Sequence, residues 1–195
     1  MKTKVFTILS MAMLLSSGIF AQNNNKRFGF ELTTGASIAT KELSDTKLNP
    51  GGGFELLFHY RFISHLGVYA GWGWNKLSAD DSFIGSDVCF EETGYIWGLQ
   101  FTHSIGNSPF SYYARGGGLY NHIETENSEG DIINNTGHGL GFQVAGGVNY
   151  HLGKNWNLTG GLKFNSLNRD TDYDGDSKSF EYQYVSLRLG VVKHF

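Results

Sequence analysis

The fold of this chain is decided by its last stretch, residues 182–195, which reads YQYVSLRLGVVKHF. Successive side chains of a β-strand point to opposite faces. One face would carry the apolar or aromatic residues Val185, Leu187, Leu189, Val191 and Phe195, and the other would carry Tyr184, Ser186, Arg188, Gly190, Val192 and His194. The apolar face would pack on a core in a soluble protein, whereas it would face lipid in a transmembrane barrel.

Seven further segments carry the same alternation. In chain order, the eight segments are residues 28–38, 52–62, 66–77, 93–103, 110–122, 139–151, 156–167 and 182–195. A tilted strand of about 9 to 11 residues spans a bilayer. The number of segments is even, as it is in bacterial single-chain barrels.

The polarity of the two faces distinguishes a membrane barrel from a soluble one. The apolar rows, which end at Trp74 in the third segment, contain a single charge, Lys193, at one end of the last segment. The opposite rows contain the charged or ionisable residues Glu31, Glu55, His59, Arg61, Arg115, Lys163 and Arg188. A soluble barrel of lipocalin type would reverse these faces around an apolar cavity. The pattern therefore favours a barrel with lipid outside and a polar lumen.

The connections between the segments alternate in length. Long polar stretches at 39–51, 78–92, 123–138 and 168–181 alternate with short ones at 63–65, 104–109 and 153–155. Outer membrane barrels have long loops outside the cell and short turns in the periplasm. The sequence thus predicts four outer loops and three periplasmic turns.

The N-terminus predicts export. Lys2 and Lys4 precede an apolar run and a group of small residues, which is typical of a signal peptide at 1–21, followed by the barrel domain at 22–195. No later stretch approaches about 18 consecutive apolar residues, so we expect no transmembrane helix. Cys89 is the only cysteine, which excludes an internal disulfide. The mildly acidic net charge of −3 argues against nucleic acid as a partner.

Taken together, these features resemble the small outer membrane β-barrel domain family related to OmpX and the OmpA barrel. The segment Ser186-Leu187-Arg188-Leu189-Gly190, in a strand that ends at Phe195, carries much of the resemblance. The resemblance implies an all-β, eight-stranded, antiparallel up-and-down barrel in the outer membrane, in contact with lipids and lipopolysaccharide. It also implies that Phe195 is the C-terminal signal that the barrel-assembly machinery recognises.

The lumen charges form the first candidate site. Glu31 and Glu55 could neutralise Arg61, Arg115, Lys163 and Arg188 in a hydrogen-bonded network that includes His59. An eight-stranded barrel is just wide enough for side chains to fill it, which favours a stiffened interior over a narrow ion or proton path. Glycine runs at 116–118, 146–147 and 160–161 would permit either sharp strand curvature or the close approach of bulky lumen side chains.

A second candidate site is a calcium loop. Residues 170–181 match the pattern D-x-D-x-D-G-x5-E, in which the side chains of Asp170, Asp172, Asp174 and Glu181 and the Asp176 carbonyl would be ligands. The stretch joins two strands instead of two helices, and Asp and Gly are also ordinary turn formers. A plain solvated loop therefore competes with calcium binding, and we expect no other cofactor.

Catalysis is the remaining alternative. Some small outer membrane barrels are lipid A deacylases or acyltransferases that use a serine and a histidine. In the segment 156–167, the outward row reads Leu162, Phe164, Ser166, so the histidine expected two residues before Ser166 is missing. We therefore predict a monomer without catalysis that acts in envelope integrity or surface interaction through its outer loops. A lipid A enzyme and a narrow channel are the alternatives.

Overall fold

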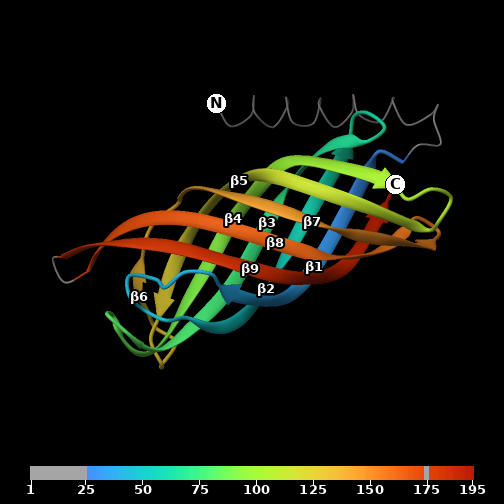
Figure 1. The fold of residues 1–195 in the computed structure, drawn as a ribbon. Helices are drawn as coiled ribbons and strands as arrows, with labels where there is room; N and C mark the ends of the chain where they lie inside the picture. Colours follow the sequence, from blue (N-terminus) through green and yellow to red (C-terminus); the bar gives the residue numbers. More distant parts are fainter. Residues whose placement is uncertain (1–25, 174–175) are drawn as a thin grey trace, which may run out of the picture.

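The computed structural model describes residues 26–173 and 176–195, and its strands form a closed antiparallel barrel (Figure 1). The strands are β1 (Phe28–Ala39), β2 (Asn49–Arg61), β3 (Leu66–Ser82), β4 (Gly85–Ser104), β5 (Phe110–Glu126), β6 (Ile132–Asn135), β7 (Gly139–Gly153), β8 (Trp156–Tyr173) and β9 (Asp176–His194). Their order is β4-β3-β2-β1-β9-β8-β7-β5, and a β4–β5 pairing closes the ring. The short β6 is attached to β5 alone, so the barrel has eight strands, as the sequence predicted.

The last residue of the chain completes the closure between β1 and β9. The register pairs Gly29 with His194 and Leu32 with Val191. The backbone amide of Phe28 donates to the carbonyl of Phe195 over 3.2 Å, and the amide of Phe195 donates to the carbonyl of Phe28 over 3.0 Å. Both ends of the barrel domain therefore lie at the same end of the barrel.

The two faces of β9 have the polarity that the alternation predicts. Leu187 and Leu189 are 54% and 61% exposed on the outside, whereas Ser186 and Arg188 are 1% and 4% exposed on the inside. Outward-facing aromatic residues mark both edges of this apolar band. At one edge Trp72, Tyr95 and Tyr120 are neighbours in register across β3, β4 and β5. Among the described residues there is no helix with the length and hydropathy needed to cross a membrane.

Short turns and chain ends occupy one end of the barrel, which we call the turn end. Lys154 and Asn155 connect β7 to β8 with positive φ values of 47° and 72°. Positive φ at both central residues is the geometry of a type I′ turn, which matches the twist of the two strands it joins. The prediction of a very short connection at 153–155 is confirmed.

At the opposite end, which we call the tip end, the prediction of four long loops is wrong, because most of the predicted loop residues belong to extended strands. β3 and β4 continue until only Phe83 and Ile84 separate them, and β8 and β9 remain paired out to Tyr173 and Asp176. β5 extends to Glu126 and adds β6 beside it. Only the β1–β2 connection, residues 40–48, remains a long loop without a strand.

The strands extend because their alternation continues with its polarity reversed. On β3 the outward residues change from Trp72 and Trp74 to Lys76, while the inward residues change from Asn75 to the buried Leu77. Apolar side chains now face inward, as in a soluble β-protein. The sequence interpretation was based on the outward apolar rows, and it therefore assigned 78–92 to a loop instead of to the continuation of β3 and β4.

Inward-facing apolar residues form a plug inside the tip end. The apolar plug consists of Leu43, Leu48, Leu77, Ala79, Ile84, Val88, Phe90, Ile123, Leu167, Phe180 and Tyr182. Leu43 lies in the β1–β2 loop beside its bridge partner Thr46, and its side chain is fully buried. The loop therefore covers the plug with its own apolar residue.

Candidate functional site

Arg115 and Glu31 form the centre of the polar lumen. Arg115 Nη1 donates to Glu31 Oε1 over 2.9 Å, and Nη2 donates to Oε2 over 2.5 Å. His59 Nε2 lies 3.0 Å from Glu31 Oε2, and Arg115 Nε donates to Gln100 Oε1 over 2.7 Å. The paired hydrogen bonds between Arg115 and Glu31 have the bidentate geometry in which a guanidinium binds a carboxylate. It joins β1 to β5 across the barrel.

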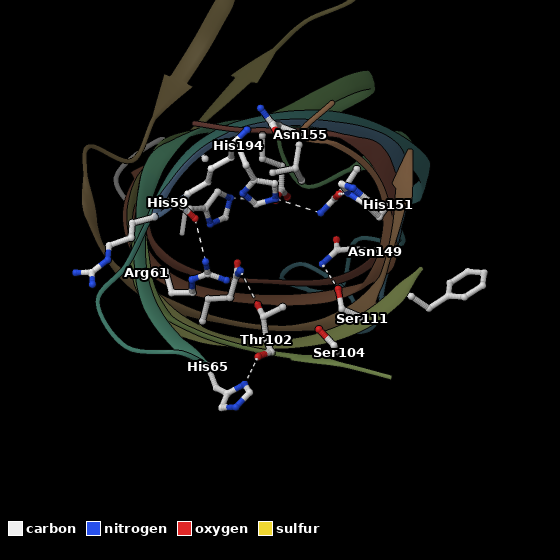
Figure 2. A pocket seen from close by; sticks show the side chains of 18 of the residues that line it. His59, Arg61, His65, Thr102, Ser104, Ser111, Asn149, His151, Asn155 and His194 are labelled. Atoms are coloured by element: carbon white, nitrogen blue, oxygen red, sulfur yellow. Dashed lines mark hydrogen bonds and ion pairs between the residues drawn. The ribbon is translucent and has the colours of Figure 1, made fainter. Parts of the chain in front are cut away.

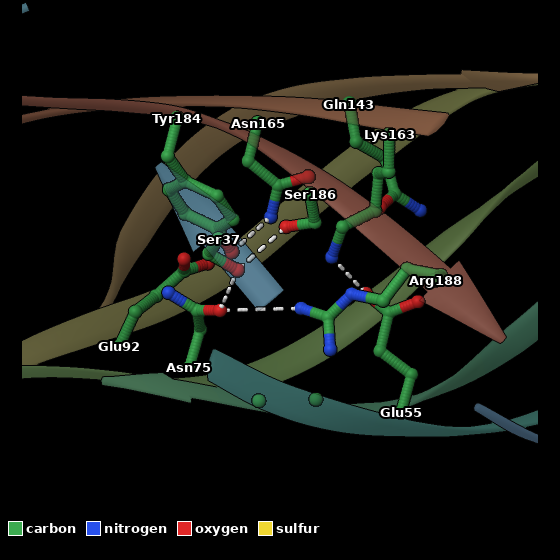
Figure 3. Close-up of polar contacts among 12 residues, drawn as sticks. Ser37, Glu55, Asn75, Glu92, Gln143, Lys163, Asn165, Tyr184, Ser186 and Arg188 are labelled. Atoms are coloured by element: carbon green, nitrogen blue, oxygen red, sulfur yellow. Dashed lines mark hydrogen bonds and ion pairs between the residues drawn. The ribbon is translucent and has the colours of Figure 1, made fainter. Parts of the chain in front are cut away.

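A second ion pair lies nearer to the plug (Figure 3). Lys163 Nζ donates to Glu55 Oε1, which links β8 to β2. Arg188 Nη2 donates to Asn75 Oδ1 over 3.2 Å, and the same oxygen accepts from Ser37 Oγ over 2.5 Å. We call Glu31, Arg115, Glu55, Lys163 and Arg188 the ionic layer. A void of about 10 Å³ beside Glu55 and Lys163 has room for about one water molecule.

Glycines make room for two tyrosines in this layer. A Cβ on Gly98 or Gly117 would lie 2.6 Å from Tyr69 Oη, and one on Gly161 would lie 2.5 Å from Tyr113 Oη. The guanidinium carbon of Arg115 sits 4.5 Å from the centroid of the Tyr113 ring. The prediction that the glycine runs admit bulky lumen side chains is confirmed at Gly117 and Gly161.

One predicted member of the lumen network, Arg61, lies apart from the others. His59 contacts Glu31 inside the barrel, but Arg61 lies at the rim, where its Nη2 donates to the carbonyl of Lys26 over 3.0 Å. Figure 2 shows the Arg61 side chain directed away from the lumen. The expectation that Arg61 joins the ionic network is therefore wrong, because Arg61 is the last residue of β2 and lies at the rim of the barrel.

Arg169 is a lumen residue that the sequence interpretation missed. Its guanidinium donates to the carbonyls of Leu140 over 2.9 Å and Asn121 over 3.1 Å, and also to that of Gly139. It thereby ties β8 to β5 and β7 where β7 begins. The signal was present, because Arg169 has the inward parity of Lys163, but the predicted strand stopped at 167.

A cavity of about 510 Å³ opens at the turn end, and we call it the vestibule (Figure 2). Glu31 and Arg115 contribute to its lining on the lumen side, and four histidines line it, namely His59, His65, His151 and His194. Asn157 bridges two of these rings, since its Oδ1 lies 2.9 Å from His151 Nδ1 and its Nδ2 lies 3.1 Å from His194 Nε2. The vestibule is thus polar, whereas the tip end of the lumen is apolar.

An ion cluster lies on the outside of the barrel, beyond the apolar band. Lys76 Nζ is 2.6 Å from Glu91 Oε1 and 2.8 Å from Glu126 Oε2, and Trp74 Nε1 donates to Glu91 Oε2 over 2.8 Å. Burial by itself would raise the pKa of Glu91, but the hydrogen bonds from Lys76 and Trp74 outweigh it and lower the pKa below its ordinary value. The cluster joins β3, β4 and β5 outside the membrane.

The predicted calcium loop is only partly described. Its backbone forms a hairpin that pairs Asp170 with Ser179 and Tyr173 with Asp176. The side chains of Asp172, Asp174 and Asp176 lie outside the described residues, as does the predicted signal peptide at 1–21. Glu181 forms an ion pair with Lys41. In the described part of the chain, no cluster of three or more His, Cys, Asp or Glu residues has the arrangement of a metal site.

Phe195 lies at the turn end with its side chain 52% exposed. Its backbone is held by Phe28, and the Phe28 ring lies 4.9 Å from the ring of Tyr60. The terminal aromatic ring is thus presented on the outside of the barrel, next to the closing strand pair.

Comparison with known proteins identifies similar barrels. Residues 7–195 match the family model described as the outer membrane protein beta-barrel domain. A comparison with curated proteins found no match.

Solved structures with the same fold include Neisserial surface protein A, at 15% identity and a TM-score of 0.64, over 89% of this chain and 100% of that one. OprG from Pseudomonas aeruginosa matches at 14% identity and a TM-score of 0.60, over 87% and 97% of the two chains. Outer membrane protein W from E. coli matches at 13% identity and a TM-score of 0.53, over 88% and 100%. At such low identities these likenesses show the fold.

Proposed function

The chain belongs to the outer membrane protein beta-barrel domain family, and from this premise we propose that it is a non-conducting, non-catalytic barrel that acts at the cell surface through its tip end. In this family architecture the turn end faces the periplasm and the tip end faces outward. The extended strands would then carry a polar surface above the membrane. The proposed role is envelope integrity or interaction with an external partner.

One observation supports this proposal most strongly. The lumen is filled by side chains at two successive levels along the barrel axis. The ionic layer crosses the barrel between β1 and β5 and between β2 and β8. The apolar plug fills the lumen beyond it, and the β1–β2 loop covers the plug through Leu43. A conducting path would have to cross apolar side chains, which exclude ions because of the cost of desolvation. This supports a structural lumen over a channel.

The surface of the tip end supports an interaction role. The outward positions of the extended strands are polar or charged, as at Lys76 and Glu91, and β6 is an edge strand with Ile132 56% exposed. An edge strand presents unpaired backbone groups that can pair with another chain. We propose that the protein is a monomer in lipid and lipopolysaccharide, and that Phe195 is the residue read by the barrel-assembly machinery.

Three measurements test the proposed function. The pure protein should give no single-channel conductance in planar bilayers, and lipid A mass spectra should be the same in cells with and without it. A strain that lacks the protein should differ in adhesion or detergent sensitivity, and the variant Ile132→Asn, with its barrel intact, should show part of that difference. Regular conductance would favour a channel, and altered lipid A would favour an enzyme.

A further inference from the structure

Two histidines meet on the outside of the barrel, directly beyond the aromatic edge of the apolar band. His122 follows Tyr120 in the outward row of β5, and His138 immediately precedes β7. His122 Nδ1 lies 3.1 Å from His138 Nε2, and the centroids of the two rings are 4.3 Å apart. We call His122 and His138 the histidine pair. It belongs neither to the vestibule nor to the ionic layer.

The backbone holds the two members of the pair next to each other. The β5–β7 register reaches Asn121 and Gly139, and His138 is the next residue toward the tip. On its other side, the amide of Thr136 donates to the carbonyl of Ile123 over 3.0 Å, and the Thr136 hydroxyl accepts from the amide of Ile123 over 3.0 Å. His138 is thus anchored to β5 from both sides, so a ligand would have little chain to order.

A carboxylate lies behind one of the two rings. Glu124 Oε1 is 3.3 Å from His122 Nε2, and the same oxygen accepts a hydrogen bond from Asn135 Nδ2 over 2.9 Å. A carboxylate beside one ring nitrogen favours the tautomer that is protonated there, which leaves the lone pair on the other nitrogen. For His122 this other nitrogen is Nδ1, the atom that faces His138. Metal-binding histidines in proteins usually have such a partner on the nitrogen that does not bind the metal.

The spacing of the two ring nitrogens suits one transition metal ion. A bond from an imidazole nitrogen to Zn²⁺ is about 2.0 to 2.1 Å long, so two nitrogens on one ion, at angles between a right angle and the tetrahedral angle, lie about 2.9 to 3.4 Å apart. The 3.1 Å between His122 Nδ1 and His138 Nε2 falls in this range. It is also the length of a hydrogen bond between the rings, and an ion would take the place of the proton that they share.

The surroundings of the histidine pair favour a cation. Glu124 is paired in register with Glu91 of β4, and Glu126 follows two residues later on the same face of β5. Lys76 forms ion pairs with both Glu91 and Glu126. These three carboxylates and one ammonium group leave a net negative charge, which raises the local concentration of cations.

We propose that His122 Nδ1 and His138 Nε2 bind one divalent transition metal ion of the class of Cu²⁺, Ni²⁺ and Zn²⁺, the ions that imidazole suits. Glu124 is a positioning residue that orients the His122 ring. Within residues 26–173 and 176–195, no group of three or more His, Cys, Asp or Glu residues is arranged to hold a metal ion. Water or an external group therefore completes the coordination, and the exposed His138 leaves the ion open to the medium. The site goes beyond the proposed surface role and does not depend on it.

The test uses the full mature chain without an affinity tag, folded in a zwitterionic detergent, with Zn²⁺ and Cu²⁺ alone as probes. Isothermal titration calorimetry should show a saturable zinc site that both His122→Asn and His138→Asn lack. The electron paramagnetic resonance spectrum of the copper-loaded parent should show coupling to two ring nitrogens. Glu124→Gln should weaken zinc binding by about tenfold, the usual cost of losing the partner of a metal-bound histidine, and should leave the two-nitrogen copper spectrum unchanged.

His103→Asn is the matched control, because His103 and His65 form another exposed pair of rings, at the turn end, with centroids 4.8 Å apart. Heat modifiability on gels verifies that each variant is folded. A parent protein that binds neither ion saturably would overturn the proposal. Zinc binding that is unchanged in both His122→Asn and His138→Asn, or that is lost equally in His103→Asn, would overturn it as well.

A double variant tests whether the two rings share one ion. Because a single ion needs both nitrogens, His122→Asn/His138→Asn should bind zinc no more weakly than either single variant. Losses that add in the double variant would mean that each ring binds independently. That result would overturn the shared site.

Discussion

The membrane half and the tip half of this barrel are built from the same strands but have opposite polarity. In the membrane half, β3 presents Trp72 to the outside and Tyr69 to a polar lumen, whereas in the tip half it presents Lys76 to the outside and buries Leu77. Lipid surrounds the first half and water surrounds the second. A strand thus keeps its alternation through a change of solvent, and only the polarity of its two faces is exchanged.

The two halves also hold their lumen together by different forces. The ionic layer depends on paired charges, whose net contribution to stability is small because desolvation opposes their attraction. The apolar plug depends on the removal of apolar area from water, which stabilises without a geometric requirement. Removal of one member of an ion pair should therefore lower the free energy of unfolding more than removal of one apolar side chain from the plug.

The largest effect should come from Glu31→Leu. The substitution leaves Arg115 buried without its carboxylate, and loss of one partner of a buried pair costs about 3 to 5 kcal/mol. The free energy of unfolding in urea, followed by tryptophan fluorescence in phospholipid vesicles, measures the effect. The double variant Glu31→Leu/Arg115→Leu should recover much of the loss. Additive losses in the double variant would contradict the coupling.

Removal of the covering side chain tests the plug. Leu43→Ala should lower the free energy of unfolding by about 2 to 5 kcal/mol, the usual cost of a large-to-small change at a buried site. Because the ionic layer still crosses the lumen, planar bilayers should show no conductance. Lys47→Ala, an exposed position in the same loop, is the control. Conductance in Leu43→Ala would mean that the plug alone closes the barrel.

A matched pair of glycines tests the packing of the membrane half. Gly117→Ala places a methyl group 2.0 Å from the backbone carbonyl oxygen of Trp97 and 2.6 Å from Tyr69 Oη, and should cost about 1 to 3 kcal/mol. Gly116→Ala is the control, because a Cβ at that position meets nothing within 4 Å. Urea unfolding of the two variants should therefore differ clearly, and equal stability would show that both the strand backbone at Trp97 and the Tyr69 side chain move aside at little cost.

The smallest effect should come from the ion cluster on the outside of the tip half. Lys76→Gln should cost less than about 1 kcal/mol, since ion pairs that remain in contact with solvent contribute little. The pKa of Glu91 is lowered in the folded state, so the pair's contribution is present above the ordinary glutamate value of 4.5 and is lost as the pH falls through the lowered value. Unfolding at pH 7 and in acid should show this difference disappear. A difference independent of pH would exclude the ion pair as its cause.

The sequence predicted the existence of the eight barrel strands correctly, but not where they end toward the tip, and both outcomes have a physical reason. All eight segments are strands of the barrel, because lipid on one side and side chains on the other impose strict alternation. The strands were predicted to end too early on the side of the tip. For β5 the difference is four residues, because the strand ends at Glu126 and not at His122. The outward apolar row stops at the membrane edge, but the pairing of the backbone does not.

The sequence predicted which charged residues lie in the lumen, but it did not predict which of them form ion pairs. Inward parity alone identified Glu31, Glu55, Arg115, Lys163 and Arg188 as lumen residues. Parity does not say which charges meet across the barrel, because strand stagger sets the height of each residue along the axis. Arg61 shares the parity of Glu55 but lies too near the rim to join the layer.

The sequence by itself determined that this chain is an eight-stranded barrel with an apolar outside and charges within, since a period of two and the composition of each row are local properties. The tertiary structure alone decided that Arg115 meets Glu31, that Lys163 meets Glu55 and that Leu43 covers the plug. These contacts join residues far apart in the chain. They depend on the stagger and closure of the whole barrel, which no single segment contains.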